Sequence, residues 1–138
     1  MASVHIEMVV DAPGDHVWAA IRDLRAIHTR FAQQFVVDTR LDGDSRLVTF
    51  ANRAVVRERI ITLDESRRRL AYSVVEWRTT HHNASFQVFA DGQTRCRLVW
   101  IADFLPNELT ELVGGMMEQG STAIKRTLET TAPHHGSS

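Results

Sequence analysis

The chain contains one cysteine, Cys96, and no long hydrophobic run. A single cysteine excludes an internal disulfide framework, and no segment supplies the roughly 20 consecutive apolar residues that span a bilayer. The N-terminal stretch MASVHIEMVVDAP also lacks the basic and then apolar segments of a secretion signal. We therefore expect a cytoplasmic protein that does not insert into membranes.

An excess of charge of one sign is also absent, because 16 basic residues stand against 17 acidic residues. Nucleic acids and anionic membranes attract strongly basic surfaces, so neither is expected as a partner. The sequence also lacks a nucleophile elbow, a phosphate-binding loop, a dinucleotide fingerprint and zinc-ligand spacing. No cofactor is expected.

What is present fits one globular domain, since the chain has 138 residues and is 43% hydrophobic. We expect a single domain over residues 1–132 and a disordered tail over 133–138. The tail sequence PHHGSS has turn-forming residues and no apolar periodicity. It is interpreted as a frayed terminus or a cloning remnant.

The periodicity of apolar residues predicts the order of the elements. Residues 3–10 alternate as a strand, and Val17, Trp18, Ile21 and Leu24 then recur at helical spacing after Pro13. A second short helix is predicted at about 25–31. Alternation then predicts antiparallel strands at about 34–41, 46–52, 54–63, 69–77, 81–89 and 94–104.

From Asn107 the apolar period becomes helical and predicts one long amphipathic helix. Its expected apolar stripe consists of Leu109, Leu112, Val113, Met116, Met117, Gly120, Ile124 and Leu128. Three glycines interrupt this helix, at 114, 115 and 120. Each costs about 1 kcal/mol relative to alanine, so the backbone is expected to approach another element closely or to bend.

The loop at Asp91-Gly92 decides which faces of the last two strands point inward. It can be read with two, three or four residues. A three-residue loop with Gly92 in the left-handed conformation keeps Arg95 and Arg97 in water, so this reading is preferred. It places His82, Ala84, Phe86 and Val88 on the same face as Thr94, Cys96, Leu98 and Trp100.

Several stretches of the chain resemble the START-like superfamily, also called SRPBCC, and within it the polyketide cyclase/dehydrase-like proteins. They are DAPGDHVWAAIRD at 11–23, VVRERIITLDESRRRLAYSVV at 55–75, DGQTRCRLVWIADFLP at 91–106 and the helix ending GSTAIKRTLE. The resemblance implies an α+β helix-grip fold. In that fold a curved antiparallel β-sheet, two short N-terminal helices and a long C-terminal helix enclose a cavity.

The chain departs from these relatives in two places, at HTRFAQQF and at LDGDSRLVTFANR. Relatives commonly carry a tryptophan and then a glycine-rich, arginine-containing strand there. No arginine of residues 45–53 is therefore assigned to the position that an arginine occupies in the cavity of the aromatase/cyclases.

Glu58 is the first candidate for chemistry, because it alternates in phase with Val56 and Ile60 on the face expected to be buried. A carboxylate in an apolar pocket must pair, accept hydrogen bonds or rise in pKa, and a raised pKa suits an acid or base near neutrality. The resemblance also implies that Glu58 points into the cavity. We expect a pKa raised by desolvation; the alternative is a salt bridge to an arginine at the sheet edge.

His82 is the second catalytic candidate, as the acid–base partner of Glu58. A metal site at His81-His82 is not expected, because adjacent strand residues point to opposite faces and cannot chelate one ion together. Tyr72 shares a face with Leu70 and Val74. Its ring either lines the pocket, with the hydroxyl orienting a ligand, or is an ordinary part of the core.

The resemblance also aligns Trp100 with a tryptophan common in relatives, which implies a place in the cavity wall. Met116 and Met117 either pack the helix against the sheet or form an adaptable cavity wall. The complete expected ligand-binding set is Tyr72, Phe86, Trp100, Phe104, Val113, Met116 and Met117.

The sequence thus predicts a cavity that binds a small hydrophobic molecule that is polyketide-, isoprenoid- or lipid-like. An enzyme would cyclise or dehydrate it, with Glu58 and His82 moving protons and Tyr72 orienting a carbonyl. A carrier or sensor would use the same cavity without turnover, and a protein-interaction module would use the outer sheet face. The oligomeric state stays open, and a homodimer is among the states considered.

Overall fold

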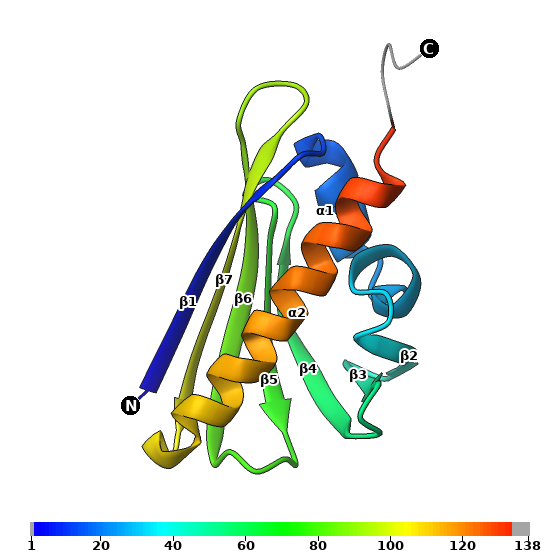
Figure 1. The fold of residues 1–138 in the computed structure, drawn as a ribbon. Coiled ribbons are helices and arrows are strands. Elements are labelled where there is room, and N and C mark those ends of the chain that lie inside the picture. The colour runs from blue at the N-terminus through cyan, green and yellow to red at the C-terminus, as the bar shows by residue number, and fades with distance from the viewer. Residues whose placement is uncertain (1, 134–138) are drawn as a thin grey trace.

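The computed structural model describes residues 2–133, which form one curved antiparallel sheet with a long helix across its inner face (Figure 1). The strands are β1 (Ala2–Val10), β2 (Val36–Asp42), β3 (Ser45–Phe50), β4 (Val55–Asp64), β5 (Arg69–Val75), β6 (His81–Ala90) and β7 (Cys96–Leu105). The helices are α1 (Gly14–Arg22) and α2 (Thr110–Thr131), with short helical turns η1 (Ile27–Phe31) and η2 (Asn107–Leu109). This is the helix-grip arrangement that the sequence predicts.

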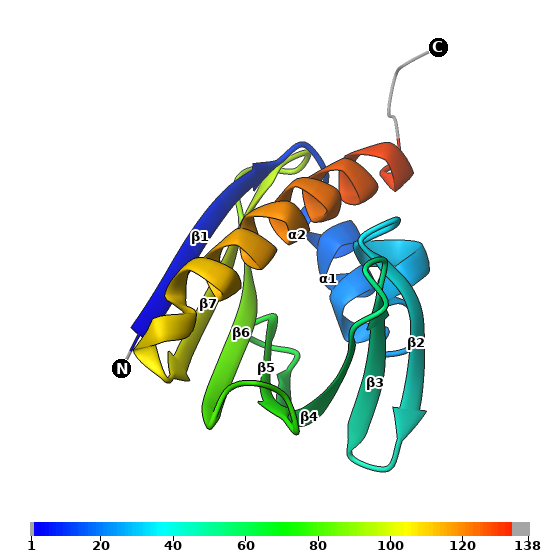
Figure 2. The same ribbon diagram turned by 60° about the horizontal axis from the view of Figure 1, so that its bottom comes forward.

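The sheet has the strand order β1-β7-β6-β5-β4-β3-β2, so consecutive strands from β2 to β7 are joined as hairpins. β1 forms one edge of the sheet and pairs with β7, where Ile6 lies opposite Trp100. Figure 2 shows the two ends of the sheet curling toward the same side, with α2 lying across the concavity. The concave face and α2 therefore enclose the interior of the domain.

The β6–β7 hairpin has the parity that the sequence predicts. Ala90 pairs with Cys96, and Phe86 lies opposite Trp100. Gly92 has a φ of 79°, the left-handed conformation that such a turn requires. Thr94 is exposed in the turn and is the one member of the expected inward set that does not belong to it.

The two short helical elements differ from expectation in type. The predicted helix at 25–31 is a single π-helical turn, in which the Ala32 N–H donates to the Ile27 carbonyl at 2.7 Å. The C-terminal helix begins with a 3₁₀ turn before α2 proper. β5 ends at Val75, before its predicted end at 77, because Glu76 takes a left-handed φ of 59°.

The buried side of α2 matches most of the predicted stripe. Val113, Met117, Gly120, Ile124 and Leu128 are buried, whereas Leu112 is exposed and does not belong to the packed face. A Cβ at position 120 would lie 3.1 Å from the Phe35 ring and 3.2 Å from the Trp100 ring, so the close approach expected of the glycines occurs there.

Gly114 and Gly115 have open space around them and require no such explanation. Within residues 2–133, α2 and the other helices are each too short or too polar to cross a membrane. Apart from Pro133, the predicted tail lies outside the described residues.

Candidate functional site

A buried ion pair joins β3 and β4 on the concave face. Arg46 lies directly opposite Glu58 in the strand register, and its Nε donates to Glu58 Oε1 at 2.9 Å. The two side chains are only 4% and 10% exposed. Glu58 thus points inward as predicted, and its partner is an arginine of the interior rather than of the sheet edge.

Arg46 makes two further contacts that fix its guanidinium. Nη1 donates to the Leu24 carbonyl at 3.5 Å, and the guanidinium carbon lies 5.8 Å from the centre of the Tyr72 ring. A cation over an aromatic face is attracted by the ring quadrupole. The stretch 45–53, to which no cavity arginine was assigned from the sequence, therefore supplies one.

The β3–β4 turn explains why the sequence did not reveal this pair. Arg46 alternates with Val48 and Phe50, the same signal that marks Glu58. The register, however, depends on a turn in which the Phe50 N–H donates to the Ala54 carbonyl at 2.9 Å, with Arg53 left-handed at a φ of 75°. No glycine marks that position, so the parity of the turn cannot be read from the residues.

Tyr72 and Trp100 are linked by a hydrogen bond across the concave face. Trp100 Nε1 donates to Tyr72 Oη at 3.1 Å, and Phe86 stacks between the two rings with centroid distances of 4.7 Å to Trp100 and 6.1 Å to Tyr72. Burial, and after it the charge of Glu58, raises the pKa of Tyr72 far above its ordinary value. The phenol therefore stays protonated and can donate a hydrogen bond.

His82 is 9% exposed and packs between two aromatic rings, with centroid distances of 5.7 Å to Phe104 and 6.4 Å to Trp77. Burial, followed by the charge of His81, lowers the pKa of His82 to about 4. The imidazole is therefore neutral near pH 7. Its Nδ1 is buried and has no hydrogen-bond partner among residues 2–133.

A cavity with two adjacent lobes lies between the sheet and α2. The His82 lobe has a volume of about 70 Å³ and is lined by Phe35, Phe50, Val56, Glu58, Tyr72, Val74, Trp77, His82, Trp100, Ala102, Val113, Met116 and Met117. The Arg46 lobe has a volume of about 60 Å³ and is lined by Ile27, Phe31, Ala32, Phe35, Val36, Arg46, Val48, Phe50, Glu58, Tyr72, Phe86, Trp100 and Ile124. Five residues border both lobes and lie between them: Phe35, Phe50, Glu58, Tyr72 and Trp100.

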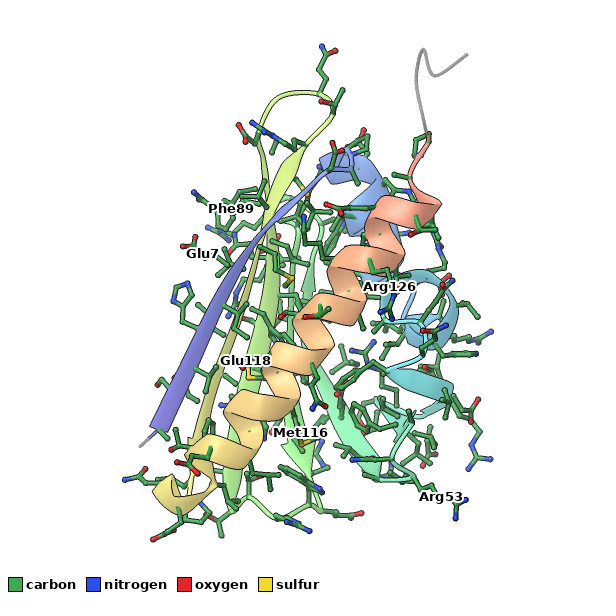
Figure 3. All side chains as sticks on the ribbon, viewed as in Figure 1. Glu7, Arg53, Phe89, Met116, Glu118 and Arg126 are labelled. Atoms are coloured by element: carbon green, nitrogen blue, oxygen red, sulfur yellow. The ribbon has the colours of Figure 1, made fainter. Side chains whose placement is uncertain are left out.

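Most of the site residues expected from the sequence line this cavity. The His82 lobe contains Glu58, His82, Tyr72, Trp100, Val113, Met116 and Met117, and the Arg46 lobe contains Phe86. Phe104 lines neither lobe, because it is fully buried behind the His82 ring. In Figure 3, Met116 and Glu118 lie on opposite sides of α2, and of these two only Met116 lines the cavity.

Sequence reasoning missed three aromatic residues of the His82 lobe, namely Phe35, Phe50 and Trp77. Phe50 ends a strand that alternates inward, so its phase indicates the cavity. Trp77 ends the strand predicted at 69–77, where alternation gives it the outward phase, but it lies in the loop after β5. Glu58 and His82, expected to act as an acid–base pair, line the same lobe, but no hydrogen bond joins them within the part of the chain that the structure describes.

The described residues contain no group of three or more histidine, cysteine, aspartate and glutamate side chains arranged to hold a metal ion. The polar groups that face the cavity are instead a guanidinium, a carboxylate, a phenol and an imidazole. Such groups can bind, orient or exchange a proton with a small molecule.

The chain matches the sequence model of a known protein family. The model of the family described as polyketide cyclase/dehydrase and lipid transport matches residues 1–132. The chain belongs to this family. The match spans every element of the described fold, so the family's sequence pattern and the helix-grip architecture agree.

Solved structures resemble this family member in fold over nearly the whole chain. A START superfamily protein from Mycobacterium smegmatis is 13% identical with a TM-score of 0.75, covering 93% of this chain and 97% of its own. Norcoclaurine synthase from Thalictrum flavum, solved in complex with dopamine and hydroxybenzaldehyde, is 17% identical with a TM-score of 0.72, covering 96% and 89%. A Thermobifida fusca protein solved by NMR is 29% identical with a TM-score of 0.75, covering 98% and 99%.

Among curated proteins, none matches this chain in sequence. The structural neighbours therefore establish the helix-grip fold, while the family match establishes the relationship in sequence.

Proposed function

We propose that this chain binds one small, largely apolar molecule in the two-lobed cavity and acts as a carrier or sensor of that molecule. The observation that carries the proposal is the cavity itself, which lies between the sheet and α2 and is walled mainly by aromatic and aliphatic side chains. Burying the apolar surface of a ligand there stabilises the complex by roughly 25 cal/mol per Å².

The size of the cavity favours a compact ligand within the hydrophobic class. The lobes have volumes of about 70 and 60 Å³. An apolar cavity of about 150 Å³ binds benzene, whereas sites for drug-sized ligands have volumes of about 300–1,000 Å³. A molecule with one ring, or a short isoprenoid, therefore fits this conformation better than a long acyl chain or a multi-ring polyketide.

The test is native mass spectrometry of freshly purified protein, followed by calorimetric titration of ligand-free protein with toluene. We expect one co-purified molecule or one toluene site per chain. Val113→Phe, which fills the His82 lobe, should weaken toluene binding at least ten-fold, whereas Leu112→Phe, at the exposed neighbouring position, should not. Absence of both a co-purified molecule and a toluene site contradicts the proposal.

A second candidate function is acid–base chemistry on the bound molecule, such as cyclisation or dehydration. The observation in its favour is that the Tyr72 phenol, the Glu58 carboxylate and the His82 imidazole all line one lobe. In that mechanism Tyr72 donates to a carbonyl oxygen, which acidifies the adjacent carbon, and His82 or Glu58 accepts the proton. Norcoclaurine synthase, which has the same fold, acts as a synthase by its name.

Glu58→Gln separates catalysis from binding. If Glu58 exchanges protons with the ligand, Glu58→Gln should bind it nearly as well and lose turnover. If Glu58 only orients the ligand, affinity should fall and no activity should be lost. Ligand affinity and turnover are both measured at a temperature at which circular dichroism shows that the variant is folded.

A further inference from the structure

Three polar groups that face the His82 lobe have hydrogen-bonding capacity left over. Tyr72 Oη accepts from Trp100 Nε1, and its own hydrogen has no acceptor within the described chain. Glu58 Oε1 accepts from Arg46, whereas Oε2 accepts no hydrogen bond from residues 2–133. His82 Nδ1 also has no hydrogen-bond partner in the described part of the chain.

His82 provides the sharpest of these observations. Leaving a buried polar atom without a partner costs about 1–3 kcal/mol, so native proteins seldom do so without a reason. The ring is held between Trp77 and Phe104 and is 9% exposed, which prevents Nδ1 from turning to bulk water. A bound molecule with a hydroxyl group would satisfy this nitrogen, because a hydroxyl both donates and accepts.

The charges that face the cavity cancel. Arg46 and Glu58 are the charged residues of the two linings, and they are paired with each other at 2.9 Å. The neutral state of His82 adds no charge. A ligand carboxylate would lose its hydration without gaining a free cation, and a ligand ammonium would lose it without gaining a free anion.

From this juxtaposition we propose that the cavity selects an uncharged, ring-sized molecule bearing a hydroxyl group, which His82 and Tyr72 recognise, and rejects acids and amines of the same size. This rests on the proposed binding function and specifies its ligand class. The apolar walls hold the ring, Tyr72 donates to the ligand oxygen, and the ligand hydroxyl donates to Nδ1 of His82.

The test is a calorimetric comparison of four probes of matched size at pH 7.5: phenol, toluene, benzoate and benzylamine. Benzoate and benzylamine should bind at least ten-fold more weakly than phenol. In His82→Phe or Tyr72→Phe the ratio of phenol affinity to toluene affinity should fall about five-fold, the equivalent of one lost hydrogen bond. His81→Phe, at the exposed neighbouring position on the other face of β6, should leave that ratio unchanged.

The outcomes separate the two proposals. If toluene and phenol bind but benzoate or benzylamine binds as tightly as phenol, the selection for uncharged ligands is wrong while the binding function stands. If the phenol-to-toluene ratio is the same in the wild type and both variants, recognition by His82 and Tyr72 is wrong. If no probe binds, both proposals fall. The charged probes are compared on the wild-type protein, so that test does not depend on how well a variant folds.

Discussion

Arg46 and Glu58 face each other across β3 and β4 as a buried ion pair, with Arg46 Nε 2.9 Å from Glu58 Oε1. Each residue cancels the charge that the other brings into the interior. The pair therefore sets the electrostatics of the cavity, since it leaves neither sign of charge free. It also ties the small β2–β3 end of the sheet to the larger β4–β7 part.

Removing one member of this pair should destabilise the fold more than removing both. Glu58→Gln leaves the Arg46 charge buried without compensation, and we expect a loss of roughly 3–5 kcal/mol in the free energy of unfolding. Arg46→Met combined with Glu58→Leu should recover much of that loss, because neither charge is then buried. Urea denaturation followed by circular dichroism measures all three proteins.

The pair of a half-buried Arg57 and an exposed Asp42 on the other face of the sheet provides the control, because Asp42→Asn should cost far less. A double variant no more stable than Glu58→Gln would show that the pair holds the fold through something other than charge compensation.

Gly120→Ala should weaken ligand binding, whereas Gly115→Ala should only stabilise the helix. A Cβ at position 120 would meet the rings of Phe35 and Trp100, which both line the cavity and would have to shift into it. At position 115 a Cβ meets nothing within 4 Å, so alanine should gain about 1 kcal/mol of helix propensity. Calorimetric titration with toluene and thermal unfolding distinguish the two; equal affinities in both variants would contradict the assignment of Gly120 to the cavity wall.

Lowering the pH should reduce the free energy of unfolding, because His82 is buried in its neutral form. Burial lowers its pKa to about 4 from 6.5 in the unfolded chain, so between these values the unfolded state binds more protons than the folded state. The stability that neutral His82 contributes is thus complete above pH 6.5 and is lost as pH falls toward 4, by up to about 3 kcal/mol.

The free energy of unfolding of wild type and His82→Phe, measured by urea denaturation from pH 8 to pH 4, checks this. The pKa of His16 is also lowered by burial and contributes a slope of the same sign in both proteins, so only the difference between them reports His82. Parallel pH profiles would show that His82 protonates freely in the folded state.

Trp100→Phe should enlarge the cavity and change its size preference. Trp100 borders both lobes, and the smaller ring removes volume from the wall between them. We expect the ratio of naphthalene affinity to toluene affinity to rise about ten-fold, with at most about 3 kcal/mol lost in stability, less than full truncation of a buried aromatic would cost. Far-ultraviolet circular dichroism and calorimetry provide the two measurements, and an unchanged ratio would place Trp100 outside the binding region.

The order of the elements, the inward phase of most strands and the apolar face of α2 could all be predicted from the sequence. These follow from local rules: alternation reveals which side of a strand is buried, and Gly92 reveals a left-handed turn that fixes the β6–β7 register. The same rules predict Glu58, Tyr72, His82 and Trp100 on the concave face, and all four line the cavity there.

Which of these groups contact one another depends on the three-dimensional arrangement of the strands and loops. The pairing of Arg46 with Glu58 depends on a turn closed by Arg53 in a left-handed conformation that no glycine announces. Among the described residues His82 Nδ1 has no hydrogen-bond partner, and this depends on Trp77, from an irregular loop, and on Phe104, from the neighbouring strand. Periodicity along one strand specifies a face, but the neighbours across a sheet follow from register and loop geometry, and the chemistry of the cavity resides in those neighbours.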